Sequence, residues 1–191
     1  MIKKDKCFTS IRMKYLTNNP ARCKYASYIL HMTKEEALDK MQRYCAYQDR
    51  CHQEVRSKLL SLKIYGDWLE EIMTELIKEG YLNEERFARN YARGKFRIKG
   101  WGKQRITREL KSRAISDYCI RKAMEEVDEE GGYEDQLRQH LQKYYESRKE
   151  KYAAPLLRKK LYAHGIAKGY ESVLINQIIE SLLFSPDRHD T

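Results

Sequence analysis

One pattern of apolar residues recurs along the 191-residue chain at a constant shift of 51 residues. Its three copies are Val55, Leu59 and Ile64, then Ile106, Leu110 and Ile115, then Leu157, Leu161 and Ile166. Two downstream positions keep the shift, as Ile72, Ala123 and Leu174 and as Leu76, Val127 and Ile178. Chance agreement between amphipathic helices rarely extends so far, and the pattern therefore predicts three structural repeats.

Each copy has the spacing of a helical unit. We expect a first helix, a second helix that carries the apolar pattern, a turn and a third helix. Nine Gly and three Pro allow long helices and disfavour an all-β fold with its many tight turns. A three-helix unit of this size buries little surface alone, so neighbouring units should pack together. The predicted fold is all-α, with three tandem three-helix repeats, about nine helices in total, in an elongated and curved array.

Local signals place the unit boundaries. Thr33 with Glu36 has the pattern of a capping box and opens a helix that runs to about Gln48. Asn83 is expected to cap another helix, and Pro155 suits the first turn of a later one. The expected organisation is a loosely held lead-in at 1–27, repeats at 28–80, 81–131 and 132–184, and a polar tail at 185–191.

The excess positive charge is concentrated in one stretch of the chain. Residues 86–113 hold eleven Lys and Arg against one acid, Glu109, so this stretch has the same net charge, +10, as the whole chain. We call these eleven bases the basic cassette. Because like charges at this density repel one another, the basic cassette is interpreted as a surface that contacts a polyanion or an acidic protein face.

Candidate contact residues lie near the middle of this stretch. They are Arg93, Lys95, Arg97, Lys99, Trp101, Lys103, Arg105, Arg108 and Lys111. Lys103 stands at a predicted helix start, where backbone N–H groups help to hold an anion. Trp101, with Phe96, interleaves with the bases: it either stacks on a nucleobase or a protein surface, or fills a hinge between helices. Other apolar residues of the stretch are expected in the core, namely Phe87, Tyr91, Ile98, Ile106 and Leu110.

Composition and motifs argue against several other functions. No apolar run approaches the roughly 20 residues of a membrane span, and the N-terminus lacks the apolar centre of a secretory signal, so we expect a cytoplasmic protein. The sequence contains no Walker loop, H-E-x-x-H or G-x-S-x-G motif, and its histidines have no partners at a telling spacing. We therefore expect neither catalysis nor a cofactor.

The five cysteines also favour a simple interpretation. They form no C-x-x-C pair, and their odd number fits a disulfide framework poorly. Cys45, Cys51 and His52 lack a fourth ligand and match no usual zinc spacing. Reduced thiols on helix faces are expected, with no metal site.

Two segments of the chain resemble a known family. The run GYLNEERFA at 80–88, followed by GKQRITREL at 102–110, resembles the signature of the RecX regulatory proteins of bacteria. The run LRKKLYAHGI at 157–166 is similar to the third repeat of that family, and the resemblance covers about Ala37 to Leu183. Where the family often has Lys-Gly-Ile, this chain has Arg113, Ala114 and Ile115. If the glycine supplies a left-handed turn, Ala114 either adopts that turn at a cost of about 1 kcal/mol or uses another geometry.

The resemblance implies a partner and a role. A RecX-like protein is a non-enzymatic array of three-helix repeats that binds the RecA recombinase filament on DNA and lowers its ATPase and strand-exchange activity. We expect a monomer that reaches DNA directly or through the filament, without a membrane. The alternative is a sequence-independent nucleic-acid-binding module, because three-helix units resemble helix-turn-helix folds and no base-reading cluster is evident.

Overall fold

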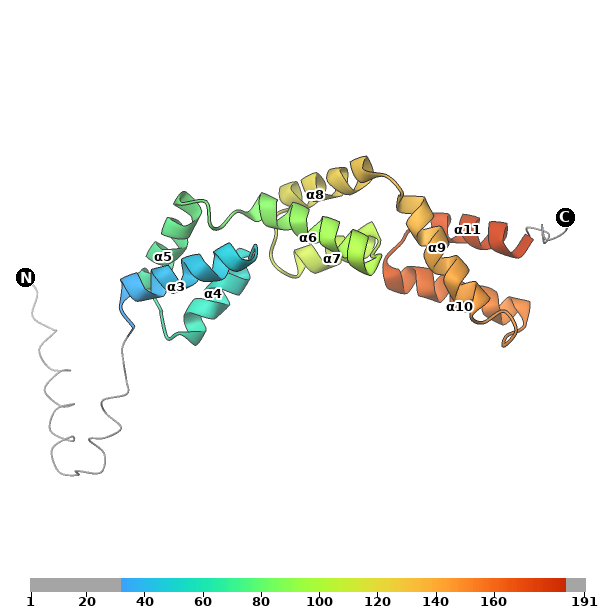
Figure 1. The fold of residues 1–191 in the computed structure, drawn as a ribbon, viewed down its shortest axis with the longest axis horizontal. Coiled ribbons are helices and arrows are strands. Elements are labelled where there is room, and N and C mark those ends of the chain that lie inside the picture. The colour runs from blue at the N-terminus through green and yellow to red at the C-terminus, as the bar shows by residue number, and fades with distance from the viewer. Residues whose placement is uncertain (1–31, 185–191) are drawn as a thin grey trace, which may run out of the picture.

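Nine α-helices follow one another in the computed structural model, which describes residues 32–184. Their bounds are α3 Lys34–Tyr47, α4 His52–Ser61, α5 Asp67–Lys78, α6 Glu84–Lys99, α7 Lys103–Lys111, α8 Asp117–Glu130, α9 Tyr133–Glu146, α10 Ala154–Lys168 and α11 Ser172–Phe184. They form three bundles of three helices along one long, bowed line (Figure 1). The predicted all-α array of three-helix repeats is confirmed. The lead-in at 1–27 and the tail at 185–191 lie outside the described residues.

The helix starts follow the local signals of the sequence. The Thr33 hydroxyl accepts from the Glu36 N–H at 3.2 Å, and the Glu36 carboxylate accepts from the Thr33 N–H at 3.0 Å, which completes the capping box. The Asn83 side chain accepts from the Arg86 N–H at 2.8 Å and caps α6. Pro155 lies in the first turn of α10. These three predictions are confirmed.

Each bundle has its own hydrophobic core. Val55 and Leu59 are fully buried in the first, Ile106 and Leu110 in the second, and Leu161 in the third. Small residues occupy several of the remaining core positions, so the helices approach closely there. No polar or charged side chain is buried among residues 32–184. The charged groups therefore all lie on the outside of the array, where they are available for contacts.

A left-handed residue ends the second helix of every unit. Lys63, Ala114 and Gly169 have φ values of 64°, 56° and 89°. After each, a backbone N–H returns to the helix: Ile64 to Leu59 (3.1 Å), Ile115 to Leu110 (3.2 Å) and Tyr170 to Gly165 (3.2 Å). The turn is therefore the same in all three units, and Ala114 adopts the left-handed conformation expected of it.

The third unit departs from the predicted register. Its turn comes at Tyr170, which is 55 residues after Ile115 rather than 51, because α10 has one extra helical turn. Ile166, the third copy of Ile64 and Ile115 in the 51-residue pattern, is still on α10 and 40% exposed, and the fully buried Tyr170 takes the corresponding position after the turn. After this turn the shift is 55 residues, so Ile178 takes the position that corresponds to Ala123. Leu174, which corresponds to Ala123 at a shift of 51, is only partly buried.

Replacing Ala114 with Gly is expected to stabilise the protein by about 1 kcal/mol, because glycine adopts positive φ without a Cβ clash. Urea unfolding followed by circular dichroism measures this change. The matched control is Ala163→Gly, at an exposed site inside α10, where the same substitution should cost about 1 kcal/mol. Loss of stability in both variants would contradict the left-handed turn at Ala114.

Arg86 joins the first unit to the second. Its guanidinium donates to the carbonyl oxygens of Gly80 (3.0 Å) and Tyr81 (3.1 Å) and to the Asp49 carboxylate (2.9 Å). Cys51, at the start of α4, is fully buried in the core of the middle unit. Asn90 of α6 also donates to the Asp49 carboxylate at 2.6 Å, and His52 lies 3.7 Å from the Glu84 carboxylate, so this joint is made of side-chain contacts. Burial raises the pKa of the Cys51 thiol, which favours the unreactive protonated form.

The second and third units are joined backbone to backbone. The N–H of Gly102 donates to the carbonyl oxygen of Lys168 at 2.9 Å, and the N–H of Gln104 donates to that of Gly169 at 3.1 Å. The last carbonyl groups of α10 thus cap the first turn of α7. A β-carbon on Gly102 would lie 2.3 Å from the Gly169 oxygen, so only glycine permits this approach.

Tyr133 completes the second joint. Its ring packs between Phe96 of the middle core and Tyr170 of the third core, with ring centroids 5.8 and 4.9 Å away. Its hydroxyl accepts from the Lys103 N–H at 3.0 Å and donates to the Glu171 carboxylate at 2.9 Å. Burial raises the pKa of Tyr133, so the hydroxyl keeps the proton that it donates.

Residues 32–184 form neither a membrane-spanning helix nor a cluster of metal-binding side chains. No helix in that range is both long enough and apolar enough to cross a membrane. Over the same residues, no three His, Cys, Asp or Glu side chains are grouped so that they could hold a metal ion. Cys45, Cys51 and Cys119 are buried free thiols, as predicted for cysteines on helix faces.

Candidate polyanion-binding surface

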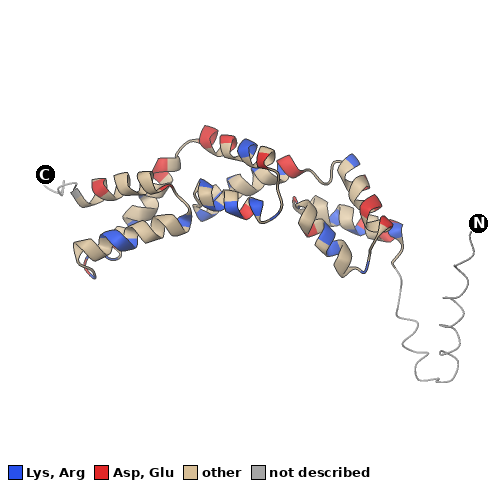
Figure 2. Cartoon of the chain, turned by 180° about the vertical axis from the view of Figure 1, so that it is seen from behind, with Lys and Arg blue, Asp and Glu red and all other residues tan. Residues whose placement is uncertain are grey.

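Charge is divided between the helices of each unit. The second helices, α4, α7 and α10, together carry ten Lys and Arg against two Asp and Glu. The third helices, α5, α8 and α11, together carry three Lys and Arg against eleven Asp and Glu. Figure 2 shows the acidic residues gathered on α8, away from the bases of α6 and α7. The array therefore has a basic side and an acidic side.

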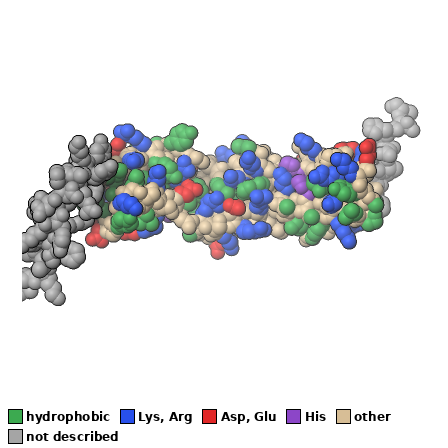
Figure 3. Space-filling model, turned by 90° about the horizontal axis from the view of Figure 1, so that it is seen from below, with side chains coloured by type: hydrophobic (Ala, Val, Ile, Leu, Met, Phe, Trp, Pro, Cys, Tyr) green, Lys and Arg blue, Asp and Glu red, His purple; other side chains and the backbone are tan. Residues whose placement is uncertain are grey.

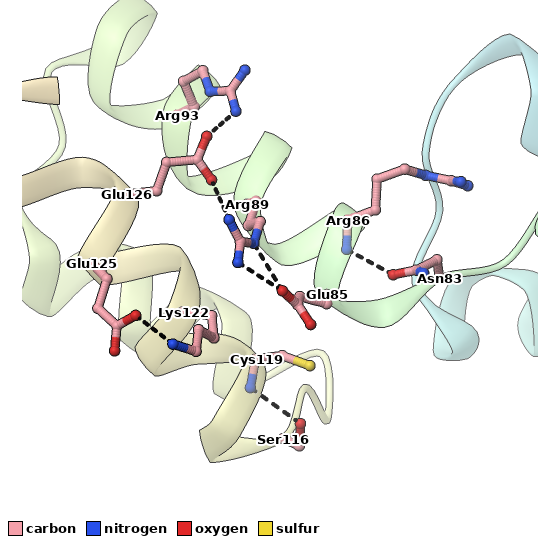
Figure 4. Close-up of polar contacts among 10 residues, drawn as sticks. All are labelled: Asn83, Glu85, Arg86, Arg89, Arg93, Ser116, Cys119, Lys122, Glu125 and Glu126. Atoms are coloured by element: carbon pink, nitrogen blue, oxygen red, sulfur yellow. Dashed lines mark hydrogen bonds and ion pairs between the residues drawn. The ribbon is translucent and has the colours of Figure 1, made fainter. Parts of the chain in front are cut away.

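Acids of α8 neutralise one side of α6. Arg89, Arg93 and Arg97 are spaced one helical turn apart and face α8. Arg89 and Arg93 both pair with Glu126 (Figure 4), and Arg97 pairs with Glu130. Because these pairs are partly exposed, they contribute little to stability, but they reduce the charge that these bases offer to a partner.

Seven of the eleven bases of the basic cassette form ion pairs with acids of the same chain. Lys103 pairs with Asp128, Lys111 with Asp117 at 3.1 Å, and Arg113 with Glu109 at 2.9 Å. Six of the seven partner acids lie outside residues 86–113, and the seventh, Glu109, lies within that stretch, so the local sequence count overstates the available charge. The other four bases make no ion pair with any residue in 32–184; we call them the unpaired bases: Lys95, Lys99, Arg105 and Arg108.

Aromatic rings and cations alternate across the middle unit. Arg113 lies over the Tyr91 ring (4.8 Å), Lys95 lies over both Tyr91 (4.9 Å) and Trp101 (5.1 Å), and Arg105 lies over Trp101 (4.0 Å). We call these five residues the cation–aromatic ladder. Such contacts hold the cations at fixed positions beside flat apolar surfaces. A polyanion that carries stackable rings fits this combination.

The ladder continues toward the first unit. Arg113 lines a shallow groove of about 610 Å³ between α4 and the end of α7. Tyr44 lies across that groove, with Arg50 4.3 Å and Lys58 5.8 Å from its ring centroid. Figure 3, which views the molecule from below, shows Lys and Arg side chains over all three units. The basic side therefore extends along the whole array.

The structure changes several of the expectations for residues of the middle unit. Ile98 was expected in the core but is 79% exposed, and Phe96 was expected among the cations but is buried. Trp101 is partly buried against the middle core and also forms two rungs of the ladder. The predicted anion site at the Lys103 helix start is wrong, because the first N–H groups of α7 are already bonded to Tyr133 and α10.

The structure adds residues that the sequence did not single out. Tyr91, expected in the core, forms a rung of the ladder. Lys168, at the end of α10, reaches the middle unit and donates to the Lys99 carbonyl oxygen at 3.0 Å. His140 and His164 lie beside it in the third unit. The signal available in the sequence was the composition of α10, which has four Lys and Arg and no Asp or Glu.

Known proteins resemble this chain in sequence. A family model described as the second three-helix domain of RecX matches residues 83–124. The protein "Regulatory protein RecX" of Prosthecochloris aestuarii is 24% identical over 148 residues, which cover 78% of this chain and 94% of that protein. Its namesake in Streptococcus uberis is 26% identical over 148 residues, but the match spans only 56% of that longer protein.

Solved structures share the fold. The crystal structure of RecX from Lactobacillus salivarius superposes with a TM-score of 0.66 at 22% identity, covering 78% of this chain and 96% of that one. A second crystal structure of a regulatory protein RecX has a TM-score of 0.69 at 16% identity, covering 89% of this chain and 84% of that one. The three-unit array is thus an arrangement already seen in crystals.

Proposed function

We infer that the chain is a regulatory protein of the RecX type and that its target is the RecA recombinase filament on DNA. Bound to the filament, it restrains ATP hydrolysis and strand exchange. The protein acts by binding, because its candidate surface consists of cations and aromatic rings rather than of paired acid and base groups.

The division of charge carries this proposal. A filament of protein on DNA presents phosphates and acidic side chains, and the basic side of the array offers ten bases on its three second helices. Acids of the third helices pair with four of these bases, Arg56, Lys103, Lys111 and Arg158, which leaves six for contact with a polyanion. A molecule with this polarity approaches a polyanion in one orientation, because the opposite orientation is repelled.

The elongated shape supports the same target. Three units in a row present contacts over a longer distance than one compact domain of the same mass (Figure 1). A contact of this length bridges neighbouring RecA subunits. Bridging favours one spacing between subunits and so opposes the changes that accompany nucleotide cycling.

Direct binding to nucleic acid is the second candidate function. The cation–aromatic ladder favours it, since a partly buried tryptophan between two cations suits a base and its phosphates. Such binding is expected to be independent of sequence and strongly salt-dependent. A pull-down on RecA filaments and on bare DNA separates the two functions: equal retention on bare DNA would remove the main support for filament recognition.

The function is tested by titrating RecA-dependent ATP hydrolysis with this protein. Hydrolysis should fall with the intact chain, and reversal of the four unpaired bases to Glu should raise the concentration needed by at least about tenfold at about 0.1 M salt. The unpaired bases are the suitable targets because their loss breaks no ion pair within residues 32–184.

A matched variant controls for net charge. Reversal of Arg43, Lys78, Arg121 and Lys122 changes the charge equally, on α3, α5 and α8, away from the cation–aromatic ladder. This control should keep the inhibition of the intact chain. Equal inhibition by both variants would contradict a role for the unpaired bases, and no inhibition by the intact chain would contradict the proposed function itself.

A further inference from the structure

Cations of two units meet at the second joint. The Lys168 ammonium donates to the Lys99 carbonyl oxygen at 3.0 Å, so it crosses from α10 to the end of α6. In the opposite direction, the Arg105 guanidinium donates to the Ala167 carbonyl oxygen at 3.0 Å. The Arg105 and Lys168 cations thus come together from α7 and α10, beside the carbonyl group of Lys99 at the end of α6. The two backbone contacts fix the positions of the cations but neutralise no charge.

Two histidines of the third unit lie at the same place. His140 on α9 packs against Gly100, so closely that a β-carbon there would lie 1.8 Å from Nε2. His164 on α10 stacks on Tyr144, with ring centroids 4.5 Å apart. Both imidazoles are half-buried. Figure 3 shows histidine side chains beside Lys and Arg side chains on the underside of the array.

We call Lys99, Arg105, Lys168, His140 and His164 the joint cluster. The charged groups around its histidines are positive on every packed helix: Lys143 on α9, Arg148 after α9, and Lys168 on α10. Within residues 32–184 no carboxylate pairs with a member of the cluster, and Glu171 nearby is bonded to Tyr133. The cluster is therefore an accumulation of cations without a counter-charge.

In the free protein the charged forms of Lys168, His140 and His164 are disfavoured. Burial, and then the charge of Arg105, lowers the pKa of Lys168. Burial lowers the pKa of both histidines, with further lowering by Lys168. In each group the charged form is disfavoured because nothing negative faces it. An anion in contact with the cluster would reverse that preference and draw protons onto both imidazoles.

We propose that the joint cluster binds phosphate groups of a nucleic-acid backbone and that His140 and His164 take up protons as it binds. The inference deepens the proposed function, from which it takes the identity of the polymer. Phosphate fits because several oxygens of one group accept from cations on different helices. The polymer follows from continuity: Arg105 belongs both to this cluster and to the cation–aromatic ladder, so one chain meets both.

Proton uptake by the two histidines makes the affinity for the anion depend on pH. The histidine pKa values lie below their usual range in the free protein and rise when the anion is bound, so affinity increases as the pH falls through that interval. A rise of one pKa unit on a single histidine strengthens binding about tenfold. Without bound anion, the histidines stay neutral and contribute little.

The test measures the affinity of the full chain for fluorescent oligothymidylate at about pH 8 and about pH 5.5. Thymine has no group that gains a proton in this range, so the pH dependence reports on the protein. Binding of the intact chain should be about tenfold tighter at the lower pH. His140→Gln with His164→Gln should lose the increase. Affinity that does not depend on pH, or an increase that survives in the double variant, would overturn the proposal.

Two controls sharpen the result. His52→Gln, in the first unit, should keep the full increase because His52 lies outside the joint cluster. Proton NMR of the histidine C2–H signals should show higher pKa values for His140 and His164 with oligothymidylate present. If inorganic phosphate raises these pKa values and the oligonucleotide does not, the site serves free phosphate and the nucleic-acid assignment is wrong. RecA is absent from these assays, so their outcome is independent of filament inhibition.

Discussion

Replacing Leu110 with Asp is expected to unfold the middle unit. Leu110 is fully buried in the core formed by α6, α7 and α8, and no cation or free donor lies among the buried residues that surround it. A carboxylate confined there loses its hydration without gaining a partner, which costs about 3 to 5 kcal/mol. That is a large fraction of the stability of a domain of this size.

The loss should extend beyond the middle unit. Cys51 from the first unit and Tyr133 from the third both pack against the middle core, so both joints weaken when it opens. Thermal unfolding followed by circular dichroism should show a clear loss of helix at moderate temperature. Gln104→Asp places the same carboxylate on an exposed position of α7 and should leave the melting curve almost unchanged. Similar curves for the Leu110 variant and the intact chain would refute the assigned core.

Replacing Gly102 with Ala is expected to separate the second and third units. The new β-carbon would lie 2.3 Å from the Gly169 oxygen and 2.7 Å from the Tyr170 nitrogen, both backbone atoms that cannot rotate away. Relief requires α7 to withdraw from α10, with loss of the bonds from Gly102 and Gln104. At about 1 kcal/mol for each bond, together with the exposed surface, the cost is on the order of 2 to 4 kcal/mol.

Amide hydrogen exchange locates this effect. Protection of the Gln104 N–H should fall by about a hundredfold or more, while helix content changes little. The matched control is Gly94→Ala on α6, where a β-carbon meets nothing within 4 Å and the helix gains propensity. Unchanged protection at Gln104 in the Gly102 variant would show that the contact does not hold the joint. Loss of protection throughout both units would instead indicate that the variant unfolds.

Sequence alone was sufficient where one short pattern decides the structure. The capping box at Thr33 and the cap at Asn83 depend on residues three apart, so they form wherever a helix begins. The second helices were found because large aliphatic residues mark their buried face. The unit order then followed from the recurrence, and the basic cassette was visible as a simple excess of one charge.

The core face of α6 was harder to predict because two of its four buried residues, Ala88 and Ala92, are small. The core face of α6 is Ala88, Ala92 and Phe96, spaced four apart, so Ile98 falls on the other side of the helix. Ala37 on α3 aligns with Ala88 at the same 51-residue shift, and both are fully buried. Alanine gives a weak hydrophobic signal, which allowed the more apolar Ile98 to be assigned to the core.

The candidate surface depended on contacts between units and between helices. Glu126 and Glu130 lie more than thirty residues from their partners on α6, so no local count of charge includes them. The extra turn of α10 preserves the helical period, and the sequence shows no gap where it occurs. That turn carries Lys168 to the middle unit. The joint cluster was therefore invisible without the arrangement of the units.

The meeting of α10 with α7 also has a mechanical consequence. The two helices abut end to end, with the carbonyl end of one against the N–H end of the other, so their dipoles align head to tail. Under a bending load the two units behave as one stiff lever. The first unit is attached through side chains, among them Arg86, Asn90 and Cys51, and compliance is concentrated there. The array thus combines a rigid arm of two units with a first unit that can change its angle without unfolding.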